Sequence, residues 1–249
     1  MARLYGYVLY FHPSDASALA DWEHVAISSV DSVEGAKNPT ELASRLTAAL
    51  APATSTISVY PTGSAPPSPR LSPAPFLIEW RHFGVGLSEK SPYYSERVTR
   101  QAKGEPAEIE FIRADLPGGV SCVIPRVLYT ERAGTFRLTP ATGKAPGSGD
   151  HRTIRLAAVM IAWNVPQHFY PYFDVVHDEW SEALTRALTA AATDKGAVPF
   201  LSTLRRMMAG LHDGHGRVTL PGTSVMASPV GWDWVEGRLV ITDVPLARG

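Results

Sequence analysis

The chain has 249 residues, 45% of them apolar and 19% charged, which is enough to bury a substantial core in one large domain or two smaller ones. Its formal net charge is −1 and it has no run of like charges, so we expect no nucleic-acid partner. No segment reaches the roughly 18 apolar residues that a membrane span requires. We expect a cytoplasmic protein, or one of the cell envelope or secreted if a signal peptide precedes Met1.

Three helical patterns occupy residues 1–60. Apolar residues recur at helical spacing in each pattern: Leu4, Val8 and Phe11, then Val25, Ala26, Val30 and Val33 after Asp21-Trp22, then Leu42, Leu46 and Leu50. The first pattern stops at an aromatic–proline corner, Tyr10 to Pro13, because proline cannot continue a helix and disfavours helix in the residue before it. These residues predict a unit of three helices.

The same order of patterns returns 158 residues later. Pro13, Trp22, Leu42, Leu46 and Leu50 correspond to Pro171, Trp180, Phe200, Leu204 and Met208. We therefore predict a second three-helix unit over residues 152–222, related to a degenerate first copy over residues 1–60. The alternative is two helical segments that share only generic amphipathicity.

The region between the two units differs in composition and in hydrophobic pattern. Residues 61–75 and 133–151 are rich in Pro, Gly, Ser and Thr and predict linkers. Residues 76–132 predict a small β module, because Val120, Cys122 and Ile124 alternate at period two. Cys122, the single cysteine, is expected to be a buried strand thiol outside any disulfide. Short strands are also predicted after the second unit, at Arg217–Leu220, Gly231–Val235 and Arg238–Val244.

The segment from Leu211 to Val218, Leu-His-Asp-Gly-His-Gly-Arg-Val, places two imidazoles and a carboxylate on one tight turn after the last helical pattern. Asp213 could orient an imidazole or cap the turn by accepting a backbone N–H. His212 lies near the helix C-terminus, where the helix dipole favours a protonated imidazole. His215 is suited to proton transfer near neutral pH, or to donating a hydrogen bond to neighbouring carbonyls.

A metal site on this turn is the weaker interpretation. His212, Asp213 and His215 are possible ligands, but the chain contains no His-Glu-x-x-His motif, and we expect neither metal nor cofactor. Other histidines, His12, His82 and His168, are expected to be core or capping groups. Ser121 lacks the Gly-x-Ser-x-Gly setting of a nucleophile.

Several of these motifs together resemble one family. Trp163-Asn164-Val165, the corner from His168 to Phe173, Asp178-Glu179-Trp180 and the turn from Leu211 to Val218 are similar to the N-terminal helical region of the C-terminal processing (tail-specific) serine peptidases, especially their tricorn-like branch. Residues 3–60 resemble the same region in degenerate form.

The resemblance implies a role for His215. In tricorn-like members the base histidine follows the end of the leucine-bearing helix, at the position of His215. The chain departs from that pattern at Gly214, where those relatives have an assisting serine, and at Gly216, where many have Thr or Ser. Glu236 to Thr242 resembles the first strand of the PDZ-like module that follows in the family.

The sequence therefore predicts an α+β protein in which two related three-helix units flank a small β module and residues 223–249 begin a PDZ-like module. The predicted function is that of the N-terminal portion of a serine peptidase acting on peptide or protein substrates, with His215 as candidate base and Asp213 as orienting or capping group. Because no segment resembles the serine-bearing loop, the C-terminal catalytic core is expected to be missing and the chain to be inactive alone. The alternative is a non-catalytic protein that binds peptide or carbohydrate on a peptidase-like scaffold.

Overall fold

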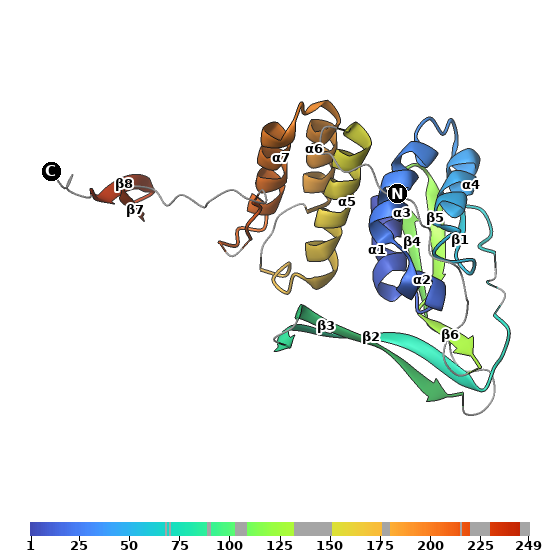
Figure 1. The fold of residues 1–249 in the computed structure, drawn as a ribbon. Coiled ribbons are helices and arrows are strands. Elements are labelled where there is room, and N and C mark those ends of the chain that lie inside the picture. The colour runs from blue at the N-terminus through green and yellow to red at the C-terminus, as the bar shows by residue number, and fades with distance from the viewer. Residues whose placement is uncertain are drawn as a thin grey trace.

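The computed structural model describes residues 1–67, 69, 71–88, 91–102, 109–131, 151–175, 180–214, 216–219 and 230–244. Within these residues the protein is a mixed α+β structure with seven helices and three small antiparallel sheets (Figure 1). In the described part of the chain, no helix is both long and apolar enough to cross a membrane.

Four helices form the N-terminal part: α1 (Ala2–Phe11), α2 (Asp15–Leu19), α3 (Trp22–Val33) and α4 (Pro39–Leu50). Side-chain caps fix where three of them begin. Ser14, Asp21 and Asn38 each accept a hydrogen bond from the backbone N–H three residues further on, which satisfies one of the free N–H groups of the first turn. The short helix α2 was not predicted from the sequence.

Three helices form the C-terminal part: α5 (Arg152–Phe169), α6 (Trp180–Thr193) and α7 (Ala197–Ala209). Helix α5 packs against both α3 and α6. Its first turn is joined to the end of α3 by Thr153, whose hydroxyl donates to Asp31 Oδ1 over 3.0 Å. It is joined to the end of α6 by Arg155, whose Nε donates to the carbonyl of Ala191 over 2.8 Å. Helix α5 therefore connects the two groups of helices.

The two groups share several local features at a spacing of 158 residues. Helix α1 ends at Phe11 and α5 ends at Phe169, while α3 and α4 begin at positions that correspond to the starts of α6 and α7. The hydroxyl of Tyr5 donates to the carbonyl of Trp22 over 3.0 Å, and Trp163 Nε1 donates to the carbonyl of Trp180 over 2.8 Å. The ring pairs differ, because Tyr5 meets Trp22 edge-on and Trp163 stacks on Trp180.

The first sheet covers α1 and α4. It has the order β1 (Ser58–Pro61), β5 (Val120–Pro125) and β4 (Phe111–Leu116), with antiparallel neighbours. All six residues of β5 are buried, and Cys122 has no exposed surface, which confirms the prediction of a buried strand thiol. Most of β1 lies inside the segment 1–60 that the sequence predicted to be helical. The β region therefore shares one core with the helices.

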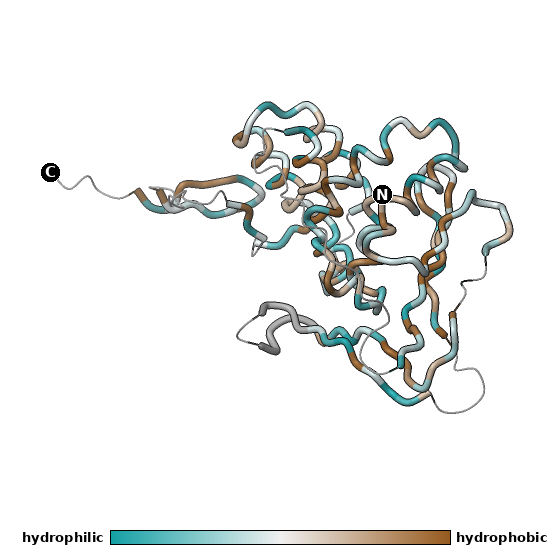
Figure 2. Tube along the Cα trace, turned by 45° about the vertical axis from the view of Figure 1, so that its right-hand side comes forward, coloured by the Kyte–Doolittle hydropathy of each residue, from teal (hydrophilic) through white to brown (hydrophobic). Residues whose placement is uncertain are grey.

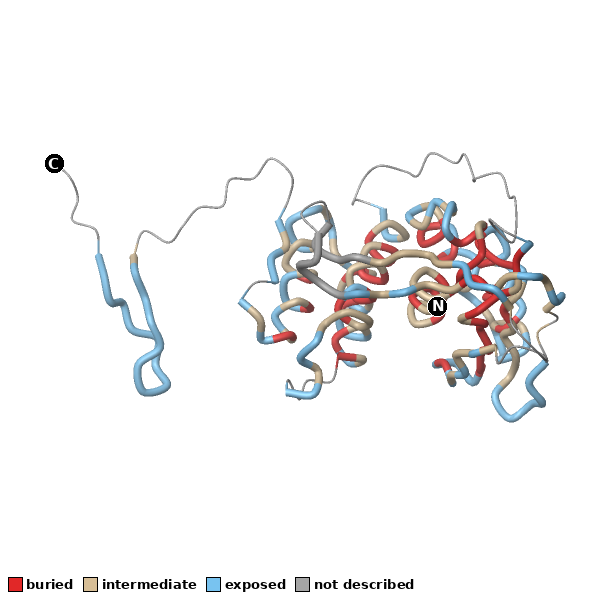
Figure 3. Tube along the Cα trace, turned by 90° about the horizontal axis from the view of Figure 1, so that it is seen from below, coloured by how far each residue is buried: buried red, intermediate tan, exposed pale blue. Residues whose placement is uncertain are grey.

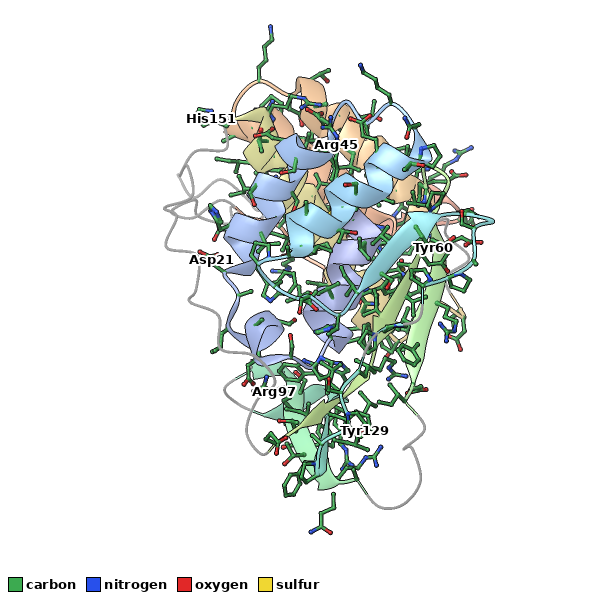
Figure 4. All side chains as sticks on the ribbon, turned by 90° about the vertical axis from the view of Figure 1, so that its right-hand side faces the viewer. Asp21, Arg45, Tyr60, Arg97, Tyr129 and His151 are labelled. Atoms are coloured by element: carbon green, nitrogen blue, oxygen red, sulfur yellow. The ribbon has the colours of Figure 1, made fainter. Side chains whose placement is uncertain are left out.

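The second sheet is a long ribbon beneath the helices. It has the order β3 (Ser91–Gln101), β2 (Phe76–Ser88) and β6 (Val127–Thr130). Only Arg126 separates β5 from β6, so the chain passes directly from the first sheet to the second. Figure 4 shows Arg97 of β3 beside α2, where it forms a 2.5 Å ion pair with Asp15. Trp80 of β2 donates to the carbonyl of His12 over 3.2 Å.

A third sheet is the hairpin of β7 (Gly231–Val235) and β8 (Arg238–Asp243), which confirms the last two predicted strands. All the residues of both strands are exposed, whereas the helices and the other two sheets contain the buried residues (Figure 3). The predicted strand at Arg217–Leu220 is wrong for the described residues 217–219, which have no regular structure. None of the strands in the described part of the chain pairs with them.

Candidate functional site

The predicted turn begins where α7 ends. Three backbone N–H groups close the end of the helix: Gly210 and Leu211 donate to Met207 and Met208, and His212 donates to Ala209. His212 is exposed and adopts a left-handed backbone conformation with a φ of 51°. Few residues other than glycine adopt this conformation, and it turns the chain sharply away from the helix axis.

Tyr170 holds the turn against the aromatic–proline corner. Its hydroxyl donates to the carbonyl of Leu211 over 3.0 Å, and the Leu211 side chain is buried. The Tyr170 ring in turn packs edge-on against Phe173 at 5.1 Å between centroids. The start of the turn is therefore attached both to α7 and to the segment that follows α5. No local sequence pattern indicates this role of Tyr170.

Asp213 shapes the turn through its backbone, because its carbonyl accepts the N–H of Gly216 over 3.1 Å. Burial raises the pKa of the Tyr170 hydroxyl, and the negative charge of the nearby Asp213 carboxylate raises it further. His215 lies outside the described residues, so its role as base and the role of Asp213 in orienting it remain predictions. Gly214 and Gly216, on either side of it, are both exposed.

The metal interpretation gains no support from the rest of the site. Among the residues that the structure describes, no group of three or more His, Cys, Asp or Glu side chains is placed to hold a metal ion. Burial raises the pKa of the Cys122 thiol to about 11, so this sulfur remains protonated at neutral pH.

His12 occupies the position that corresponds to Tyr170, 158 residues earlier. It is fully buried, and its Nε2 lies 2.9 Å from the hydroxyl of Thr54 and 2.7 Å from that of Thr56. Burial lowers its pKa to about 3, so the ring is neutral near pH 7. These contacts confirm a core role for His12. They also show that the residue after α1 and the residue after α5 both bond to the turn that follows the last helix of their group.

His82 and His168 lie together in an aromatic cluster with Tyr10, Phe11 and Phe169. His82 Nε2 lies 2.8 Å from the carbonyl of Tyr10, so it is the protonated nitrogen that donates. Burial and then the neighbouring His82 lower the pKa of His168 to about 4. Both rings therefore pack as neutral groups where α1, α5 and β2 meet.

A separate concavity lies where the two larger sheets meet. It has a volume of about 530 Å³ and is lined by Glu79, Arg100, Ile109, Glu110, Phe111, Arg113 and Val127. The guanidinium of Arg113 lies 5.1 Å from the centre of the Phe111 ring, and Arg100 lies 3.6 Å from a Glu79 carboxylate oxygen. Charged groups of both signs beside an aromatic ring can bind polar ligands through hydrogen bonds and stacking.

Comparison with known proteins finds no matching family model, no matching curated protein and no matching solved structure. The function therefore has to be inferred from these residues and their geometry.

Proposed function

We propose that this chain is the helical region of a serine peptidase of the C-terminal processing class, in which it supplies the scaffold and the base His215. The observation that carries the proposal is the attachment of the turn. The start of the turn is bonded to α7 and to Tyr170, while His212 and the glycines that flank His215 are exposed. A general base requires a fixed position and access to its substrate, and an exposed turn on a rigid support meets both requirements.

The proposal includes the relation between the two groups of helices: α1, α3 and α4 are a degenerate copy of α5, α6 and α7. Matching helix ends, the matching hydrogen bonds of Tyr5 and Trp163, and the matching positions of His12 and Tyr170 support it. In the first copy Thr54 and Ile57 occupy the positions of His212 and His215. The first copy therefore has no imidazole on this turn, and a catalytic role is restricted to the second copy.

The resemblance also assigns β7 and β8 to the beginning of a PDZ-like module. Their antiparallel pairing and their position after the second group of helices fit that assignment. In this class of peptidase the nucleophilic serine belongs to a catalytic core that follows such a module. The described helices would then support the base, and another segment would supply the serine and the donors that stabilise the oxyanion.

Labelling with a serine-directed fluorophosphonate tests the proposal. The 249-residue chain should neither react with the reagent nor hydrolyse an unstructured protein, whereas the polypeptide encoded by the whole reading frame should do both. A reading frame that encodes no fluorophosphonate-reactive serine would overturn the peptidase assignment. Hydrolysis by the 249-residue chain, after controls for contaminating protease, would overturn the assignment of the serine to another segment.

The second candidate function is binding of peptide or carbohydrate without catalysis, and the concavity between the sheets favours it. Arg100, Glu110 and Arg113 supply charges around Phe111, which offers an apolar ring for stacking. Peptide and glycan arrays, each probed with wild type and with Phe111→Ala, would identify such binding. Retention that depends on Phe111, together with a reading frame free of a reactive serine, would favour this function over proteolysis.

A further inference from the structure

The hairpin β7–β8 has one strongly apolar face, and none of the other described residues covers it. Trp232 pairs with Ile241 and Trp234 pairs with Leu239, and because cross-strand partners point to the same side, all four side chains share one face. Each of them is 55–65% exposed. The opposite face carries Asp233 and Arg238 in addition to valines. Figure 2 shows the apolar residues of the hairpin in brown.

An isolated hairpin with this composition is not expected to persist in water. Two-stranded sheets are marginally stable unless an apolar face is covered, and an exposed patch of large apolar side chains normally marks a contact surface. The hairpin therefore needs a covering element.

The first half of the chain shows how such a hairpin is covered. In β4–β5, the cross-strand pairs of Ala114 with Cys122 and of Leu116 with Val120 place another apolar face on one side. That face lies in the main core, against α1 and α4, and β5 also pairs with β1 along its edge. The hairpin β4–β5 thus closes the first group of helices.

The corresponding surface of the second group is incompletely covered. Leu46 and Leu50 of α4 are 1% and 0% exposed, whereas their counterparts in α7, Leu204 and Met208, are only partly buried. Val165 of α5 is 49% exposed. In Figure 1, α7 lies at the outer, left-hand edge of the helices.

The segment of the second group that corresponds to β1 also has no strand partner among the described residues. Residues 216–219 correspond to β1 at the same spacing of 158 and follow α7 as β1 follows α4. Arg205 of α7 fixes this segment by donating from Nε to the carbonyl of Val218 over 3.0 Å. In the first half β5 pairs with β1, but the structure describes no strand beside 216–219.

We propose that the hairpin β7–β8 docks within the same chain onto α5 and α7, with β8 pairing along residues 216–219 as β5 pairs along β1. Trp232, Trp234, Leu239 and Ile241 then cover Leu204, Met208 and Val165. The connection from residue 219 to Gly231 can span about 40 Å when extended. That length is enough for the chain to run back past the segment 216–219 and across β8 to the start of β7. This inference rests on the proposed relation between the two groups of helices and does not require the peptidase activity. If it holds, the hairpin belongs to the second group of helices and not to a PDZ-like module.

Amide hydrogen exchange measured by mass spectrometry tests the docking. In the 249-residue chain, residues 238–243 should exchange at least about tenfold more slowly than an unstructured peptide, since a free hairpin opens readily. Leu204→Glu and Trp234→Ser should each abolish this protection. Thr189→Glu, at an exposed site on α6, and Val240→Thr, on the opposite face of the hairpin, should preserve it. Circular dichroism should show unchanged helix content in each variant.

Three results would overturn the inference. Free exchange of 238–243 in the wild type would show that nothing in this chain covers the hairpin. Protection that survives both Leu204→Glu and Trp234→Ser would place the hairpin elsewhere. Protection that disappears on dilution, together with a dimeric mass in light scattering, would assign the covering surface to a second copy. None of these measurements depends on proteolysis, so failure of the docking and failure of the proposed function are distinguishable.

Discussion

Gly6 is the residue at which α1 approaches α5 most closely. A Cβ atom at this position would lie 1.9 Å from Asn164 Oδ1 and 2.6 Å from His168 Nε2. Asn164 is fully buried and cannot turn away, because its Nδ2 donates to the carbonyls of Ala2 and Met160 over 2.9 Å. The packing of the two helix groups therefore depends on the absence of a side chain at Gly6.

We expect Gly6→Ala to lower the free energy of unfolding by about 1–2 kcal/mol, because the steric cost exceeds the gain in helix propensity. Urea denaturation measures this change. Gly214→Ala is the matched control, since its Cβ would meet no atom within 4 Å, and it should change stability by less than about 0.5 kcal/mol. Equal stability of the two variants would show that α1 and α5 are further apart than described.

His12 should make stability depend on pH. Burial lowers its pKa from 6.5 to about 3 in the folded protein, so between these values the unfolded chain binds the proton and the folded chain does not. The contribution of His12 is then complete above about pH 6.5 and falls as the pH decreases, by about 2 kcal/mol between pH 6.5 and 4.5. His12→Gln should remove roughly half of the wild-type dependence, because His168, whose pKa burial lowers to about 4, loses stability over the same range.

Urea denaturation at several pH values measures this dependence of stability on pH. His151→Gln, at an exposed position, serves as the control and should retain the wild-type slope. A wild-type protein with constant stability from pH 6.5 to 4.5 would show that His12 is accessible to solvent.

At the scale of elements, the matching pair of hydrogen bonds predicts matching effects. Tyr5→Phe should cost about 1 kcal/mol, because it removes the hydroxyl that donates to the partly buried carbonyl of Trp22. Trp163→Phe should cost about 3 kcal/mol, because it removes the donor to Trp180 and also leaves a cavity. Tyr172→Phe, at a position 56% exposed, should be neutral. A neutral Tyr5→Phe would mean that this bond does not hold the first group of helices together.

The helices could be predicted from sequence because the information is local. Apolar spacing, the proline after each aromatic corner and the caps Asp21 and Asn38 lie within a few residues of the helix that they define. Helix α2 was missed because five residues are too few to show a periodic pattern.

Strand pairing could not be predicted in the same way, because it depends on residues distant in the chain. Tyr60 belongs to a strand because it pairs with Ser121 of β5. No sequence pattern near Tyr60 indicates that partner. Arg217–Thr219 has a similar β-branched composition, yet the structure gives it no regular conformation in the absence of a partner strand.

The position of the turn at the end of α7 could be predicted from the sequence, because the helical pattern before it is local. The roles of Asp213 and His215 on that turn stay predictions. The hydrogen bond from Tyr170 to Leu211 was missed, because it joins segments 41 residues apart. The correspondence of Tyr170 with His12 was the available signal, since both residues follow an aromatic helix end at the same spacing.

The two groups of helices are similar, but they differ in how they are covered and in the residues on the turn after their last helix. The first group is closed by β1, β5 and β4 and has Thr54 and Ile57 on its turn, which suits a structural role. The second group has His212 and Asp213 on its turn, beside a surface that we propose the hairpin covers. In this arrangement the first group of helices would stabilise the fold, and the second group would carry the proposed catalytic turn.

The most direct test of the peptidase claim is the rate at which the polypeptide encoded by the whole reading frame hydrolyses an unstructured protein, measured for wild type, His215→Ala and His212→Ala. If His215 is the base, His215→Ala should lower kcat/KM by about a hundredfold or more, while His212→Ala stays within about threefold of wild type and both variants keep the wild-type Tm. A His215→Ala enzyme that retains its rate would contradict the claim. So would an equal loss of rate in the two variants, because that result would assign the turn a structural role in place of a catalytic one.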